Sequence, residues 1–135
     1  MPEDHRAALH RQLDTLELRA VVRMPGGSTL REAASLLRQM NVSSALVGDS
    51  HRDIVTERDL TRALAEGRGP DDVVENIVEG TPVWASTTSY VVDAAEMMLH
   101  HGIRHLIVIG VDGRAAGVVS MRDIFALLLP HDGLA

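Results

Sequence analysis

Two four-residue elements of the sequence combine a hydroxyl, an arginine and a carboxylate at the same spacing. They are Thr56-Glu57-Arg58-Asp59 and Ser120-Met121-Arg122-Asp123. The hydroxyl residue is expected to begin a helix, where free backbone amides and the helix dipole attract an anion such as phosphate. The arginine adds a cation, and the aspartate one turn later can accept hydrogen bonds from both hydroxyls of a ribose. The pattern is therefore suited to binding a phosphorylated sugar.

The same spacing also has a purely structural interpretation. A Ser or Thr followed three residues later by an acidic residue forms a capping box, which stabilises a helix by about 1 kcal/mol without any ligand. The coincidence favours a functional role, because the arginine occupies the third place both times and each element follows a strand-like pair, Ile54-Val55 or Val118-Val119. Both interpretations remain open at the level of the sequence.

The two elements belong to a longer internal repeat. Residues 30–47 align with 91–108 at an offset of 61, and residues 53–60 align with 117–124 at an offset of 64. Each half predicts a strand, a helix, two strands and a second helix. A capping box begins the helix at Thr29, Asn41 and Gly102 are suited to end the equivalent helices, and Asp112-Gly113 indicates a hairpin turn. We therefore expect a mixed α+β (α/β) fold of two β-α-β-β-α repeats packed as a pseudo-twofold pair.

The repeats set the expected organisation of the chain. An N-terminal helix is expected over residues 1–19, followed by the first repeat (20–68), a linker helix (69–80), the second repeat (81–130) and a tail (131–135). First strands are expected near 20–23 and 82–85. An apolar stripe of Leu9, Leu13 and Leu16 predicts that the N-terminal helix packs on the repeats or at a dimer contact.

Composition excludes several classes of function. The chain has 135 residues, a net charge of −6, three aromatic residues, no cysteine and no lysine. Negative charge and few aromatics argue against nucleic acid as a partner, and no apolar run approaches the roughly 20 residues of a membrane span. We expect a cytoplasmic protein.

Catalysis and metal binding are not expected either. Cysteine and lysine nucleophiles are absent, and no serine lies in a nucleophile elbow. His101 and His105 have the spacing of a helical ligand pair, but Gly102 should end the helix between them. The sequence therefore predicts a protein that is not an enzyme and needs no metal or other cofactor.

The ordered blocks resemble a known family. Gly117-Val118-Val119-Ser120 with Arg122-Asp123, preceded by residues 102–108 and by Thr81-Pro82-Val83, resembles the CBS domain, named for cystathionine β-synthase. The tandem over residues 20–130 resembles a CBS pair, or Bateman module. The resemblance implies a regulatory module that binds AMP, ADP, ATP, S-adenosylmethionine or sometimes NAD in two clefts between the repeats. It also implies a homodimer that signals to a protein target, which the sequence does not identify.

The resemblance also assigns roles to residues. Asp59 and Asp123 would hold ribose. The residues that would face phosphate are Thr56, Ser120, Arg58 and Arg122. Each cleft would borrow further contacts from the other repeat: Val21, Val42 and Ser43 for the Asp123 cleft, and Pro82, Ile103 and Arg104 for the Asp59 cleft.

The first repeat departs from the pattern. Asp53 stands where the second repeat has Gly117, and the connection between its last two strands is three residues shorter. An additional carboxylate repels phosphate. We therefore expect the Asp123 cleft to bind better than the Asp59 cleft. The alternative is a dimerisation or protein-interaction module of the same fold that binds no ligand.

Overall fold

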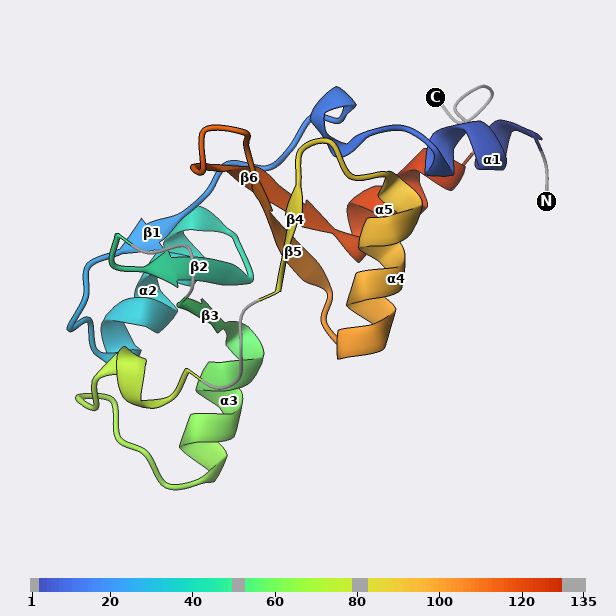
Figure 1. Cartoon of the computed structure of the whole chain (residues 1–135). Coiled ribbons are helices and arrows are strands. Elements are labelled where there is room, and N and C mark those ends of the chain that lie inside the picture. Colours follow the sequence, from blue (N-terminus) through green and yellow to red (C-terminus); the bar gives the residue numbers. More distant parts are fainter. Residues whose placement is uncertain (1–2, 50–52, 79–82, 130–135) are drawn as a thin grey trace. The chain divides into compact units, whose positions relative to one another are not determined.

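The computed structural model describes residues 3–49, 53–78 and 83–129 (Figure 1). The chain divides into two compact units. The first-repeat unit is Val21–Pro82, and the second-repeat unit joins Met1–Ala20 to Val83–Ala135. The N-terminal segment therefore belongs with the second repeat, although the first repeat follows it in sequence.

The first-repeat unit contains a three-stranded sheet and two helices. Its elements are β1 (Arg23–Met24), α2 (Leu30–Met40), β2 (Ser44–Val47), β3 (Ile54–Thr56), α3 (Glu57–Ala65) and a 3-10 turn at Val74–Asn76. The central strand β2 pairs parallel with β1 and antiparallel with β3. The capping box at Thr29 and the left-handed Asn41 that ends α2, with φ of 54°, are both confirmed.

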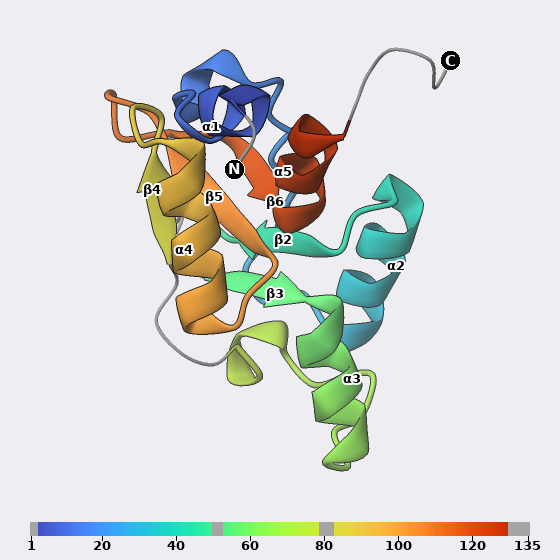
Figure 2. The same ribbon diagram turned by 90° about the vertical axis from the view of Figure 1, so that its right-hand side faces the viewer.

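The second-repeat unit has the same topology. Its elements after the N-terminal segment are β4 (Trp84–Ser86), α4 (Val91–His101), β5 (His105–Ile109), β6 (Ala115–Ser120) and α5 (Met121–Leu128). The sheet order is β4-β5-β6, parallel and then antiparallel. Helices α4 and α5 lie side by side on one face of this sheet (Figures 1 and 2). The predicted β-α-β-β-α order is thus confirmed in both halves.

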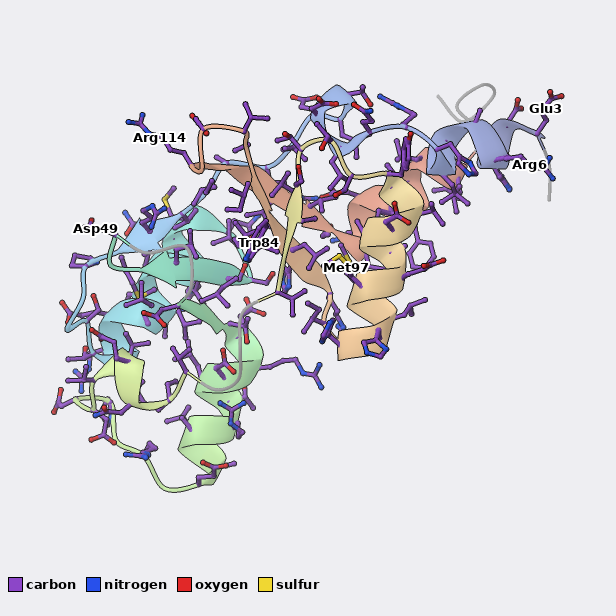
Figure 3. The ribbon with its side chains drawn as sticks, in the orientation of Figure 1. Glu3, Arg6, Asp49, Trp84, Met97 and Arg114 are labelled. Carbon is purple, nitrogen blue, oxygen red and sulfur yellow. The ribbon has the colours of Figure 1, made fainter. Side chains whose placement is uncertain are left out.

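Each unit has its own hydrophobic core. In the second-repeat unit, buried side chains of the strands meet those of α4 and α5, and Met98 is fully buried among them. Met97 extends from α4 and packs against this core (Figure 3). Both methionines therefore fill space in the core, as their helical positions predict.

The N-terminal segment is less helical than the sequence pattern suggested. Helix α1 covers only Glu3–Leu9, and a 3-10 turn follows at Leu13–Thr15. The chain leaves the helix because its backbone bonds to the loop before α4: the Leu13 amide donates to the Ser89 carbonyl at 2.8 Å and the Asp14 amide to the Thr87 carbonyl at 2.9 Å. Leu13 is completely buried as a result. The apolar stripe therefore packs on the second repeat as predicted, but its leucines lie on a short helix and a separate 3-10 turn and not on one long helix.

Other expected segments can be compared in part. The linker expected to be helical over 69–80 contains only the 3-10 turn at Val74–Asn76, and its last two residues lie outside the described residues, as does the tail 131–135. The longest described helices have 11 residues, and none in the described ranges has the length and apolar character to cross a membrane.

Candidate functional site

The start of α5 carries the second hydroxyl-carboxylate element. The Asp123 amide donates to Ser120 Oγ at 3.1 Å, and the Ser120 amide donates to Asp123 Oδ2 at 3.0 Å, which completes a capping box. The Met121 amide donates to the Arg104 carbonyl at 2.8 Å. These bonds use the amides of residues 120, 121 and 123. The amide of Arg122 is not used by any of them, and the exposed Arg122 side chain follows directly.

A second group reaches the same carboxylate from the N-terminal segment. Arg19 donates through Nε to both Asp123 oxygens at 3.1 Å, and through Nη2 to Oδ1 at 2.9 Å. Its backbone is fixed to β6, because the amides of Arg19 and Val118 each donate to the other's carbonyl, at 3.1 and 3.0 Å. Asp123 is thus held by its own helix and by a segment far away in sequence.

The N-terminal segment passes so close to β6 that position 117 must be a glycine. A Cβ atom at Gly117 would lie 2.6 Å from Leu18 Cβ and 2.9 Å from the Arg19 carbonyl oxygen. Both distances are shorter than real Cβ contacts, so only glycine fits beneath the segment. The contrast between Gly117 and Asp53 was therefore the one signal in the sequence that could have indicated the contact with Arg19.

A cavity of about 240 Å³ borders the Asp123 carboxylate. It is lined from the N-terminal segment by Arg11, Leu16, Glu17 and Leu18, and from β6 and α5 by Val119, Asp123, Ala126 and Leu127. Pockets for whole drug-sized ligands have volumes of roughly 300–1,000 Å³. The cavity therefore has room for part of a nucleotide, and Asp123 is one of its charged lining residues.

The charges at this site stabilise each other. Burial has the largest influence on the pKa of Asp123 and raises it, but the hydrogen bonds from Arg19 and Ser120 together outweigh burial, so the pKa lies below its ordinary value. The hydrogen bond to Asp123 and the negative charge of its carboxylate raise the pKa of Arg19. Asp123 is therefore ionised at neutral pH and can act only as a hydrogen-bond acceptor.

The first repeat has an equivalent site with a different cationic partner. Thr56 and Asp59 form the same capping box, with bonds of 2.9 and 3.1 Å, and the Glu57 amide donates to the Ser43 carbonyl at 3.0 Å. Asp59 Oδ1 accepts from Arg62 of the same helix at 3.1 Å, and Arg62 also donates to the Ile77 carbonyl. The capping interpretation of both elements is therefore confirmed. Among the residues that the structure describes, Asp123 is also bound by a separate segment, whereas the cation that binds Asp59 comes from its own helix.

Comparison with known proteins identifies the family. The family model of the CBS domain matches residues 17–66 and 74–130. The chain belongs to the CBS domain family. Its two matched segments correspond to the two repeats, so the protein is a CBS pair.

Individual relatives agree with this assignment. An uncharacterized 17.7 kDa protein of Acidianus ambivalens is 36% identical over 104 residues, which cover 75% of this chain and 63% of that protein. The solved CBS domain protein PAE2072 from Pyrobaculum aerophilum, complexed with AMP, has a TM-score of 0.75 at 33% identity, and the match covers 84% of this chain and 89% of that chain. The CBS-domain protein ATU1752 from Agrobacterium tumefaciens also has a TM-score of 0.75, at 27% identity, with 82% and 91% covered. The CBS pair spans 44–63% of the length of three curated relatives.

The remaining residues assigned by resemblance lie in both units of the CBS pair. In the first-repeat unit, Val21, Val42 and Ser43 are half-buried and Arg58 is exposed. In the second-repeat unit, Ile103 packs against the core and Arg104 is exposed. Pro82 lies outside the described residues. The assignment of this whole set to a ligand rests on the resemblance.

Proposed function

We propose that this CBS pair is a regulatory module that binds an adenosine-containing ligand at Asp123. The ligand class comprises AMP, ADP, ATP and S-adenosylmethionine, and the role is binding without catalysis. The main support is the AMP complex of the Pyrobaculum aerophilum protein, which is 33% identical over 84% of this chain. The half-buried Asp123 carboxylate beside a cavity is the feature of this chain that fits such a ligand.

The chemistry of the Asp123 site suits a ribose phosphate. An ionised carboxylate can accept from both ribose hydroxyls, and a hydrogen bond to a charged group contributes about 1.5–3 kcal/mol. The beginning of α5 supplies the favourable end of the helix dipole, and Arg122 adds an exposed guanidinium. A sugar at Asp123 would thus place its phosphate beside positive potential.

Regulation follows from a shift in population. A ligand that binds one conformation of the module more tightly increases its share, and a partner that contacts only that conformation responds. We propose that the CBS pair acts in this way as a homodimer in the cytoplasm and regulates a protein target.

The binding role can be tested with Asp123→Ala. We expect AMP affinity, measured by isothermal titration calorimetry, to fall about 10- to 100-fold because one charged contact to the ribose is lost. Asp59→Ala is the matched control, since Asp59 caps α3 as Asp123 caps α5. We expect a smaller effect from this control. Unchanged AMP affinity in Asp123→Ala would reject the ribose role.

One observation favours a second candidate function. Both carboxylates already have partners within the chain: Asp59 accepts from Thr56 and Arg62, and Asp123 from Ser120 and Arg19. This arrangement is also what a ligand-free dimerisation or interaction module would need. Thermal unfolding with AMP, ATP and S-adenosylmethionine separates the two, because a ligand at 100 times its Kd stabilises by about 2.7 kcal/mol. Absence of any shift would favour the interaction module.

A further inference from the structure

Arg19 occupies the hydrogen-bonding positions that a ribose would need. The Asp123 oxygens receive three contacts of 2.9–3.1 Å from this guanidinium and one of 3.0 Å from the Ser120 amide. Two carboxylate oxygens offer about four acceptor sites in all. A sugar whose two hydroxyls bind Asp123 must therefore displace Arg19.

We propose that Arg19 determines ligand specificity at the Asp123 site by favouring adenosine ligands that carry a phosphate over uncharged adenosine. This inference rests on the proposed function and names the class of ligand within it. The argument depends on where the guanidinium can go once it is displaced.

The displaced guanidinium remains close to the ligand. The Arg19 backbone is held by two hydrogen bonds to Val118, and the Gly117 contact leaves no space for the segment to move towards β6. Its side chain is 57% exposed, so it can change rotamer without disrupting the core. The Arg19 guanidinium can therefore change position only within the reach of its side chain from Asp123, because the backbone of the N-terminal segment stays in place.

A phosphate on the ligand can replace the ion-pair partner that Arg19 loses when the ribose binds Asp123. An uncharged nucleoside that takes Asp123 leaves Arg19 without its ion pair, and this lost pairing weakens binding. A phosphate on the same ribose offers two oxygens that the planar guanidinium of Arg19 can bind through two parallel N–H groups. The exchange of one anion for another then retains a charge-assisted contact for Arg19.

The charged residues that line the cavity do not replace Arg19. Arg11 lines the cavity, but its guanidinium donates to the Thr15 carbonyl at 2.8 Å and to Thr15 Oγ1 at 3.2 Å. Glu17 and Asp123 are the two acidic residues of the lining. Without Arg19, Arg122 at the beginning of α5 remains a cation next to Asp123, but the two acidic lining residues repel a phosphate, so part of the preference for the phosphate is lost.

The test compares AMP with adenosine, which differ only in the phosphate. Calorimetric affinities of both are measured for the intact chain, Arg19→Gln and Arg19→Lys. We expect the intact chain to prefer AMP and Arg19→Gln to reduce that preference about 10-fold or more, with adenosine bound equally well or more tightly. Arg19→Lys keeps the charge without the planar fork and should retain part of the preference. Arg114→Gln is the charge-matched control, because Arg114 is exposed in the turn between β5 and β6 (Figure 3), and it should leave the preference unchanged.

The outcomes separate this inference from the proposed function. If AMP and adenosine both bind and Arg19→Gln keeps the same preference, the specificity role is overturned while nucleotide binding stands. If the intact chain and Arg19→Gln bind neither compound, the proposed function fails and the specificity role fails with it. Circular dichroism of each variant confirms that the comparison is between folded proteins.

Discussion

Replacing Gly117 by alanine tests how tightly the N-terminal segment is held against β6. Gly117 is a buried residue of this strand, and a Cβ there would lie 2.6 Å from Leu18 Cβ and 2.9 Å from the Arg19 carbonyl oxygen. In an extended strand without such a contact, Gly→Ala stabilises by about 0.4–1 kcal/mol, because alanine restricts the unfolded chain. The sign of the effect therefore reports directly on the contact.

The size of the effect follows from the two ways in which the clash can be relieved. If the segment stays in place, overpacking costs about 1–3 kcal/mol. If the segment moves away, the two backbone hydrogen bonds between Arg19 and Val118 are lost, at about 0.5–1.5 kcal/mol each. After a gain of about 0.7 kcal/mol from alanine is subtracted from a mid-range cost of about 2 kcal/mol, we expect Gly117→Ala to lower the free energy of unfolding by about 1.3 kcal/mol.

Urea unfolding followed by circular dichroism measures the stability, and hydrogen exchange of a peptide over residues 14–20 locates the change. Gly69→Ala is the matched control, because nothing lies within 4 Å of a Cβ at that position. The control should be neutral or stabilising. A Gly117→Ala variant as stable as the original chain, with the same exchange protection of Arg19, would refute the close contact.

Three further predictions concern the same unit. Leu13→Ala should lower the free energy of unfolding, measured with urea, by about 2–5 kcal/mol because the Leu13 side chain is fully buried. The control Leu99→Ala, at a residue that is 75% exposed, should change it by no more than about 0.5 kcal/mol. Equal effects would contradict the packing of the N-terminal segment on the second repeat. The folded pKa of Asp123 lies below its unfolded value of about 3.9, so its ion pair with Arg19 should stabilise the fold above that pH and lose this contribution as the pH falls through the folded pKa. Asp123→Asn should therefore flatten this part of a profile of unfolding free energy against pH. An unchanged slope would argue against the ion pair. Ser120→Ala should cost about 1 kcal/mol and speed exchange of the Asp123 amide, and unaltered exchange would show that the cap contributes little.

Local chemistry made much of the fold predictable. The capping box at Thr29, the left-handed Asn41 and the caps at Thr56 and Ser120 depend on residues within one helical turn, so the sequence pattern contains the information for each. The helix predicted over residues 1–19 is too long, because the apolar periodicity continues to Leu13 while the backbone there bonds to a loop about 75 positions further on. Periodicity does not report such a distant partner.

The same limit applies to the site. Asp123 and Ser120 form one local motif and could be selected from the sequence, but Arg19 is 104 positions away from Asp123 and belongs to no motif. Only Gly117, compared with Asp53 in the first repeat, carried a trace of the contact. A glycine in a strand indicates that something passes close by without saying what it is.

The discontinuous second-repeat unit affects the order in which the nascent chain can fold. Residues 21–82 are continuous and can form their own core as soon as they leave the ribosome. Leu13 and Arg19 must wait for β6 and α5, about 100 residues later, which at 5–20 residues per second is roughly 5–20 s. During that interval the leucines of the N-terminal segment are exposed to solvent and to molecular chaperones. The N-terminal segment is therefore synthesised before the first repeat but reaches its final position after it.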